Sequence, residues 1–235
     1  MNLFKNYNQI LILSLTSLIF LSFFLGFYFD ENSAGAGGYK GDFSLNWGNL
    51  KIFLNNDLIT AINYTDGRDP NNMYNSSRPP TVYILHKLFN PFLETENSFR
   101  RSVFLISLSS PFLFYFCLRE KFKHVEKILL ILISSIILLS PYYRTSAFWA
   151  LDENYSFICI LLSYYFLKKF LKKEHKSSYN IYLEIFLIIL FSSLCIYFDQ
   201  KLLIIPFICF LSIFLSKIKF IIKLFSFFCY IILSI

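Results

Sequence analysis

The sequence predicts an all-α polytopic transmembrane helix bundle of six or seven spans, with a large outer loop that carries interfacial helices. Three observations predict this fold class. Of the 235 residues, 56% are hydrophobic and 16% are charged, whereas soluble domains carry about 25% charged residues. The apolar residues form runs that approach the roughly 20 residues a helix needs to cross a bilayer. The lysines that dominate the net charge of +7 gather between these runs.

This composition excludes a disordered chain, a disulfide scaffold and a conventional soluble enzyme. A basic chain also suits a nucleic-acid-binding protein, but that class needs a basic patch on a soluble face, so we expect no nucleic-acid partner. The five cysteines lie inside apolar runs without CxxC or Cys/His ligand spacing. We therefore expect them to pack as small apolar residues.

The apolar runs predict the spans in order along the chain. The first run is long enough for a signal anchor, which we favour over a signal peptide cleaved near Ala34-Gly35-Ala36. The last run reaches Ile235 without a polar flank, which suggests a fragment truncated at its C-terminus. We treat residues 1–235 as a single transmembrane domain, with expected spans at 10–29, 102–118, 128–142, 155–167, 181–198, 202–215 and 220–235.

The lysine distribution predicts which side of the membrane each loop faces. Lysine and arginine concentrate near residue 5 and in the loops at 119–127, 168–176 and 217–219, whereas the alternate loops carry few of them. Because positive residues stay on the cytoplasmic side, we expect a cytoplasmic N-terminus and an outer loop at 30–101. The abundance of Phe, Ile, Lys and Asn favours an AT-rich bacterial genome, and hence a bacterial plasma membrane.

The outer loop at 30–101 holds most of the glycines and four of the seven prolines. Two stretches within it have a helical pattern. A first amphipathic helix is predicted by apolar residues at helical spacing, namely Trp47, Leu50, Leu54, Leu58 and Ile62. A second helix is predicted to start after Pro79-Pro80 and to end near Phe89. Its His86 lies within an apolar stretch, which favours a structural role.

Acidic pairs mark the outer ends of two predicted spans. Asp30 and Glu31 end the first span and precede a glycine-rich stretch, so that a carboxylate on a rigid helix end faces a loop that can close over a ligand. Asp152 and Glu153 precede a later span, and such a pair can bind a divalent cation or orient a hydroxyl. The alternative is that all these acids simply mark the water boundary of their helices.

Cations on the same predicted side can hold a phosphate. They are Arg78, Arg144 and Lys201. Acids that can deprotonate a hydroxyl, beside cations that can hold a phosphate, fit transfer from a lipid-phosphate donor. The sequence contains no P-loop, Rossmann, GxSxG or HExxH motif, so nucleotide-driven transport and the common hydrolases have no motif to support them.

These features resemble the N-terminal half of a GT-C superfamily glycosyltransferase. Relatives of this kind include protein O-mannosyltransferases, aminoarabinose transferases of lipid A and lipopolysaccharide sugar transferases of the dolichyl-phosphate-mannose-transferase type. The resemblance covers roughly residues 8 to 210 and rests on the Asp30-Glu31 pair, on Arg78-Pro79-Pro80-Thr81-Val82-Tyr83 and on the segment from Ser140 to Asn154. Members usually have more spans, and often a C-terminal outer domain, than this chain provides.

The resemblance implies a fold, a donor and a set of roles. Asp30 would be the catalytic base with Glu31 beside it, Asp152 and Glu153 would contact substrate or a divalent cation, and Arg78, Arg144 and Lys201 would contact the substrate. The donor would be a polyprenyl-phosphate-linked sugar, and the acceptor a hydroxyl of a glycan, lipid or protein outside the membrane. The base would take a proton from the hydroxyl as it attacks the anomeric carbon of the sugar.

Other functions remain open at this point. A secondary transporter or flippase usually places charges at the middle of the membrane or shows internal repeats, and neither is evident. A surface-polysaccharide polymerase or ligase shares the combination of many spans and a large outer loop. A non-catalytic membrane subunit is the remaining alternative.

Overall fold

The computed structural model describes residues 2–32, 38–66, 79–172 and 178–234, and within these residues every regular element is a helix, without a β-strand. The all-α prediction is therefore confirmed. The helices are α1 (Asn2–Tyr28), α2 (Gly38–Asn55), α3 (Leu58–Thr65), α4 (Thr81–Phe89), α5 (Glu96–Ser107), α6 (Ser109–Lys121), α7 (Lys127–Ser135), α8 (Pro141–Phe148), α9 (Glu153–Lys172), α10 (Ser178–Phe198), α11 (Ile204–Phe214) and α12 (Phe220–Ser234), with 3₁₀ turns η1 (Ile136–Leu139) and η2 (Gln200–Leu203).

Three helical stretches in the described residues are long and apolar enough to cross a membrane. They are Asn8–Tyr28, Glu96–Lys121, which joins α5 to α6, and Ile181–Phe198. A bent pair, Lys127–Leu139 with Pro141–Phe148, makes four if it counts as one span. The remaining apolar helices are too short or too polar to qualify by length and composition, so six or seven spans are more than the described helices support.

The bend in the fourth candidate span follows from its local sequence. The two halves meet at 69° around Ser140 and Pro141. Proline lacks the N–H that would continue the preceding helix, but its fixed φ suits the first position of a new one. Ser140 caps that new helix, because its hydroxyl accepts a hydrogen bond from the backbone N–H of Tyr143. One expected span at 128–142 is therefore two short helices that point in different directions.

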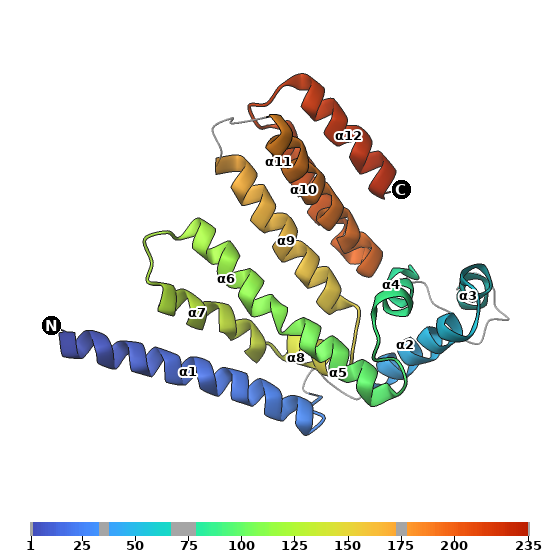
Figure 1. Ribbon diagram of the computed structural model, residues 1–235, viewed down its shortest axis with the longest axis horizontal. Coiled ribbons are helices and arrows are strands. Elements are labelled where there is room, and N and C mark those ends of the chain that lie inside the picture. Colours follow the sequence, from blue (N-terminus) through green and yellow to red (C-terminus); the bar gives the residue numbers. More distant parts are fainter. Residues whose placement is uncertain (1, 33–37, 67–78, 173–177, 235) are drawn as a thin grey trace.

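The long helices spread like a fan, with α1 at one edge and α12 at the other (Figure 1). The turns α6–α7 and α11–α12 lie at the wide end of the fan, on the same side as the N-terminus, while α2, α3 and α4 gather at the narrow end (Figure 1). Lysines predominate at the wide end, and the segments that follow α1 and α8 lie at the narrow end. The α6–α7 turn therefore lies at the opposite end of the bundle from the acids that follow α1.

The segment between α1 and α5 contains helices where the sequence predicted them, with one error of extent. The helix after Pro79-Pro80 is confirmed as α4. The expected amphipathic helix through Ile62 is wrong in extent, because α2 ends at Asn55 and Asp57 caps a separate α3 by accepting from the Thr60 backbone N–H at 2.9 Å. Trp47 and Leu50 are buried, whereas Leu58 and Ile62 on the new helix are exposed.

An aromatic cluster joins α1 to α5 and α8 at the narrow end of the fan. Phe27 and Phe23 stack on Phe104 with ring centroids 4.3 and 5.2 Å apart, and Phe148 packs 4.9 Å from Phe23. Such pairs contribute about 0.5–1.5 kcal/mol each beyond the area that they bury. A second core joins α9, α10, α11 and α12. All five cysteines are free and four of them are buried, as expected for small apolar residues.

Candidate functional site

The end of α1 fixes the first acidic pair in space. The Glu31 N–H donates to the Gly26 carbonyl at 2.9 Å and the Asp30 N–H donates to the Phe27 carbonyl at 3.3 Å. These two bonds are the Schellman motif, in which the residue after the cap adopts the left-handed conformation. Asp30 is that residue, with φ of 53°, and aspartate tolerates this region better than most side chains. The two carboxylates consequently leave the helix end in different directions.

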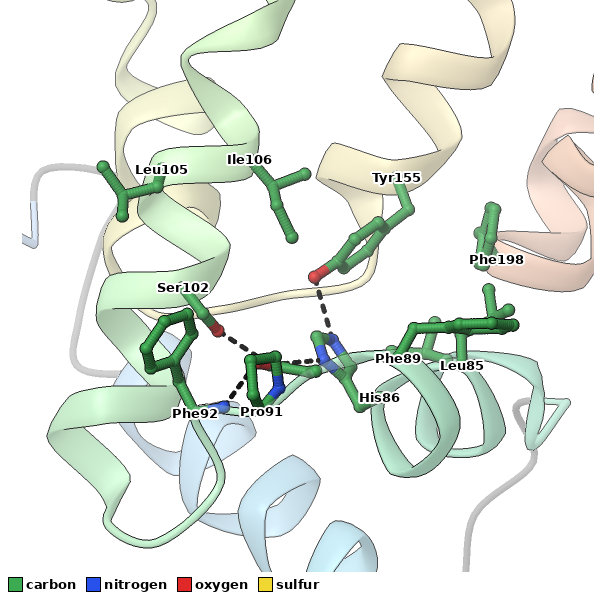
Figure 2. A pocket seen from close by; sticks show the side chains of 12 residues that line it. Leu85, His86, Phe89, Pro91, Phe92, Ser102, Leu105, Ile106, Tyr155 and Phe198 are labelled. Carbon is green, nitrogen blue, oxygen red and sulfur yellow. Dashed lines mark hydrogen bonds between the residues drawn. The ribbon is translucent and has the colours of Figure 1, made fainter.

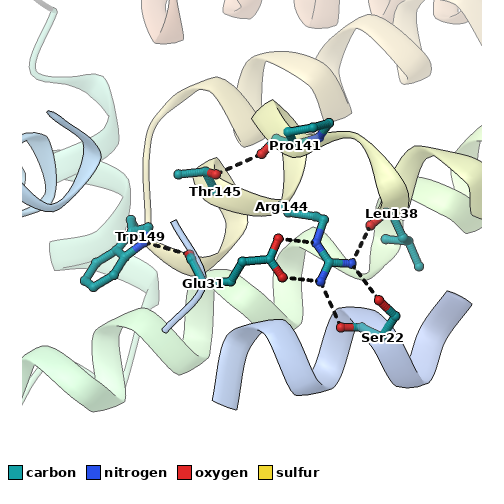
Figure 3. Close-up of polar contacts among 7 residues, drawn as sticks. All are labelled: Ser22, Glu31, Leu138, Pro141, Arg144, Thr145 and Trp149. Atoms are coloured by element: carbon teal, nitrogen blue, oxygen red, sulfur yellow. Dashed lines mark hydrogen bonds and ion pairs between the residues drawn. The ribbon is translucent and has the colours of Figure 1, made fainter. Parts of the chain in front are cut away.

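Glu31 turns back onto the bundle and forms a bidentate ion pair with Arg144 of α8. The Arg144 Nε and Nη2 atoms lie 2.8 and 2.5 Å from the two carboxylate oxygens (Figure 3). The same guanidinium donates to the Ser22 hydroxyl, the Ser22 carbonyl and the Leu138 carbonyl (Figure 3). A guanidinium has five N–H donors, and here all five are used. Arg144 is therefore a buried cross-link between α1 and α8.

Gly26 makes room for this ion pair. A Cβ atom at that position would collide with the Arg144 guanidinium, the Glu31 carboxylate and the ring of Phe148. The charged side chains therefore lie directly against the backbone of α1, where no larger residue fits.

Asp30 points toward a different arginine. Its carboxylate accepts from Arg100 Nη2 at 2.6 Å, while Arg100 Nε donates to the Phe148 carbonyl at 2.9 Å. The Arg100 side chain is 10% exposed and the Asp30 side chain 61%. The guanidinium carbon also lies 4.2 Å from the ring centroid of Trp149, a cation–π distance. Arg100 thus holds one side of the Asp30 carboxylate, and the other side is exposed.

Arg100 has capacity that Arg144 lacks. It makes two side-chain hydrogen bonds to the described residues, so three of its five N–H donors have no partner among them. We call Asp30, Glu31, Arg100 and Arg144 the charged cluster. The Trp149 indole N–H links its two halves by donating to the Glu31 carbonyl at 3.1 Å. Of these four residues the sequence predicted three, and Arg100 was missed because it stands directly before the predicted span at 102–118, where an arginine usually marks topology.

The end of α8 repeats the geometry of the end of α1. The Leu151 N–H donates to the Ser146 carbonyl at 3.0 Å, and Ala150 between them has φ of 50°. This turn directs the chain into Asp152 at the start of α9. Asp30 is thus itself the left-handed residue at the end of α1, whereas Asp152 and Glu153 follow the left-handed Ala150 at the end of α8.

Asp152 belongs to a buried polar network with the α1–α5 segment. Asn46 of α2 donates to its carboxylate at 3.4 Å, and the Tyr83 hydroxyl of α4 donates to Asn46 at 3.1 Å. Asn49 completes the network by donating to Tyr83 at 3.2 Å. Asp152 is 3% exposed, so it holds α2 and α4 against the start of α9. The two asparagines could not be recognised from the sequence, because asparagine in a loop ordinarily implies a turn.

The remaining expected residues do not join the charged cluster. Lys201 is exposed in η2, and its backbone N–H donates to Asp199 at 3.0 Å. Glu153 begins α9. Arg78 lies outside the described residues. In the described part of the chain, no three His, Cys, Asp or Glu side chains are grouped as a metal ion requires, so Asp152 and Glu153 lack a third such ligand there.

A groove along α1 ends at the charged cluster. It has a volume of about 630 Å³ and is lined by Leu18, Leu21, Ser22, Leu25, Gly26, Phe29, Glu31 and Arg144. Its walls suit an apolar chain, but the hydrogen bonds of Arg144 are already made. Of the two arginines of the charged cluster, Arg100 is therefore the one with N–H donors left over among the described residues.

Comparison with known proteins identifies no relative, so the function is inferred from the chemistry of the charged cluster. No family model, no curated protein and no solved structure matches the chain. The arrangement itself combines an exposed carboxylate, an arginine with unused donors and an aromatic ring at one end of a set of apolar helices. Such a site can accept a proton from a hydroxyl and hold an anionic group in one step.

Proposed function

We propose that the chain is an integral membrane glycosyltransferase that moves a sugar from a polyprenyl-phosphate donor to an acceptor hydroxyl on the outer face of a bacterial plasma membrane. The observation that carries the proposal is the pairing of exposed Asp30 with Arg100, whose remaining N–H donors have no partner among the described residues. In this orientation the narrow end of the fan is outside and the N-terminus is cytoplasmic. The shorter apolar helices also cross the membrane.

The reaction is a single displacement. Asp30 takes the proton of the acceptor hydroxyl as its oxygen forms a bond to the anomeric carbon. The bond between that carbon and the phosphate oxygen breaks, and the polyprenyl phosphate leaves with the electron pair. Unused donors of Arg100 stabilise the added negative charge on the phosphate, since charge-assisted hydrogen bonds from arginine are among the strongest in proteins.

The other predicted residues support this chemistry from a distance. Glu31 and Arg144 fix the end of α1 on α8, and Asp152 fixes α2 and α4 beside it. These are positioning residues, and Asp30 and Arg100 are the residues that contact substrate. Trp149 lies over the Arg100 guanidinium and offers an aromatic surface next to the site.

A transfer assay tests the proposal. Membranes that contain the chain are supplied with a panel of polyprenyl-phosphate-linked hexoses and pentoses carrying a label, and label that leaves the lipid fraction is measured. We expect transfer by the unmodified chain and a loss of about 10²-fold or more in Arg100→Lys, because a lysine cannot reproduce the planar array of donors. The matched control is Arg101→Lys at an exposed position, with unchanged transfer. Absence of transfer from every donor in the unmodified chain would overturn the proposal.

A transporter is the second candidate, and the bent pair is the observation that favours it. Broken helices near a binding site are typical of secondary transporters, and here the break at Ser140 and Pro141 stands next to Arg144. Movement of an intact labelled lipid or solute across vesicles, without cleavage of the sugar, would support the transporter over the transferase.

A further inference from the structure

A second pocket lies away from the charged cluster, between α4, α5, α9 and α10. It has a volume of about 430 Å³, within the range of small-molecule sites. Most of its wall is apolar, with Val82, Leu85, Phe89, Leu105, Ile106 and Phe198 among the lining residues. Its polar side chains come from His86, Asn90, Ser102 and Tyr155, and Figure 2 shows the Tyr155 hydroxyl directed at the His86 ring.

The hydrogens of this polar group can be assigned from two backbone anchors. The Phe92 N–H can only donate, and it donates to Asn90 Oδ1 at 2.9 Å, so Asn90 Nδ2 is the donor side of the amide. At the other end the Phe99 carbonyl can only accept, and it accepts from the Ser102 hydroxyl at 2.7 Å. Asn90 Nδ2 then donates one hydrogen to Ser102 Oγ at 2.8 Å and the other to His86 Nδ1 at 2.9 Å.

This assignment fixes the tautomer of His86. Because Nδ1 accepts, Nε2 of the neutral ring carries the hydrogen and donates it to the Tyr155 oxygen at 2.8 Å. Burial lowers the pKa of His86 to about 4, which agrees with a neutral ring. The hydroxyl hydrogen of Tyr155 is left over, and no acceptor for it lies among the described residues. A pocket that is otherwise apolar therefore presents one directed hydrogen-bond donor.

The lining also restricts the charge of the ligand. No Lys, Arg, Asp or Glu is among the residues that line this pocket in the described chain. An anion such as a lipid phosphate would be desolvated there without a cation to balance it. A free sugar would leave most of its hydroxyls without partners. The pocket suits a neutral, largely apolar group with a single oxygen acceptor.

The position of the pocket identifies the source of such a group. Phe198 is the last residue of the candidate span Ile181–Phe198, and Ser102 stands early in the candidate span Glu96–Lys121. The pocket thus lies at the same end of two candidate spans. The ends of a span stand near the boundary between hydrocarbon core and headgroups, where the ester groups of a bilayer lie. Its rim continues onto exposed apolar side chains, including Phe89 at 76%, Phe92 at 56% and Leu105 at 60%.

We propose that this pocket binds an acyl chain of a glycerolipid, whose ester carbonyl accepts a hydrogen bond from the Tyr155 hydroxyl. The bound lipid packs α4 and the start of α5 against α9 and α10. An isoprenoid chain fits less well, because it has no oxygen along its length to accept from Tyr155. The site is separate from the charged cluster and does not depend on the transferase proposal.

The test compares ester with ether lipids on the unmodified chain in nanodiscs. A phosphatidylcholine with a photoreactive acyl chain is crosslinked to the protein. Unlabelled diester phosphatidylcholine, dialkyl-ether phosphatidylcholine of equal chain length and a polyprenol are compared as competitors. We expect labelling on α4, α5, α9 and α10, and a diester that competes roughly 2- to 10-fold better, the range for one neutral hydrogen bond. Equal competition by the two lipids would overturn the proposal, as would labelling confined to other helices or stronger competition by a polyprenol.

Tyr155→Phe gives the matching side-chain test. The variant keeps the ring and removes the donor, so the preference for ester over ether should disappear. Tyr142→Phe is the control, since Tyr142 is exposed on α8 outside this pocket and its variant should retain the preference. A Tyr155→Phe protein that folds and still prefers the ester would contradict the assigned donor.

Discussion

Gly26 shows how a single missing side chain makes room for charge at the surface of an apolar helix. The Glu31–Arg144 pair lies where a Cβ would stand, and the Gly26 carbonyl accepts the bond that closes the helix end. Burying an arginine is costly unless its donors are satisfied. At this position the ion pair, two carbonyls and a serine hydroxyl satisfy them together.

The substitution Gly26→Ala should therefore destabilise the protein. Overpacking of a closely fitted site costs about 1–3 kcal/mol, and here the displaced group is a charged pair. Thermal unfolding in detergent measures the change. Gly41→Ala is the matched control, because nothing lies within 4 Å of a Cβ at Gly41. Alanine in that helix should stabilise by about 0.5–1 kcal/mol, and the same loss in both variants would contradict the account of Gly26.

His86 should make stability depend on acidity. Its pKa falls from 6.5 to about 4 because the ring is buried, so the folded protein holds the neutral form. Between pH 6.5 and about pH 4, the His86 imidazole is protonated in the unfolded chain but neutral in the folded chain. The contribution of His86 to the free energy of unfolding is therefore fully present above pH 6.5. It is lost as the pH falls toward 4, by about 3 kcal/mol in total.

Denaturation from pH 7.5 to 4.5 in detergent measures this decline. His86→Asn removes the titrating group, so its stability should be lower overall but should change less over this range. His124→Gln, at an exposed position in the α6–α7 turn, should keep the full dependence. An unchanged slope in His86→Asn would exclude His86 as the cause.

Residue chemistry was only partly predictable from the sequence. Asp30 and Glu31 were predicted as a pair at the end of the first span, and in the structure they turn toward two different arginines. Arg100 was missed, because an arginine next to an apolar run is usually a topology signal. Nothing in the sequence distinguishes a guanidinium with every donor used from one with donors to spare, since that depends on carbonyls contributed by distant helices.

At the level of helices, the way in which α1 and α8 end positions the acidic residues more than the lengths of these helices do. Both α1 and α8 end at a backbone bond from the residue after a left-handed position, with Asp30 and Ala150 at positive φ where glycine is usual. Such turns send the chain sharply away from the helix axis, and each is followed by acids of the site. The sequence predicted the helix after Pro79-Pro80 correctly because proline marks starts, but it offered no glycine to mark these two stops.

Ala150→Gly should stabilise the protein, because the left-handed region costs a non-glycine residue about 1–2 kcal/mol. Ala147→Gly, inside the last turn of α8, should destabilise by about 0.5–1 kcal/mol or more. Unfolding in detergent compares the two variants. Destabilisation by both would show that the Ala150 methyl group, which is buried, contributes more to packing than its backbone strain costs.

At the scale of the whole molecule, the charge difference between the two ends of the fan predicts orientation. A membrane-impermeant thiol reagent tests this on intact cells, in a background with the five native cysteines replaced. Cysteine at exposed Asn97, near the narrow end, should react in intact cells, whereas cysteine at exposed Lys123, in the α6–α7 turn, should react only after permeabilisation. The opposite pattern would invert the orientation.

The all-helical class was predictable because apolar runs and lysine-rich turns are local signals. The number of spans was less so. A bent pair and several short helices, such as α11 and α12, look like spans in a hydropathy pattern but are shorter than a bilayer requires. Whether they cross depends on how they pack together, which a pattern along one chain does not contain.

The central claim is that the exposed carboxylate at the end of α1 removes the proton from an acceptor hydroxyl. Sugar transfer from a polyprenyl-phosphate donor by Asp30→Asn measures it directly, beside Asp57→Asn, which keeps the cap of α3 because asparagine caps helices as well as aspartate does. A positioned base contributes about 10²–10⁴ in rate, so Asp30→Asn should lose that factor while its thermal unfolding stays close to that of the unmodified chain. Near-normal transfer by folded Asp30→Asn would contradict the account.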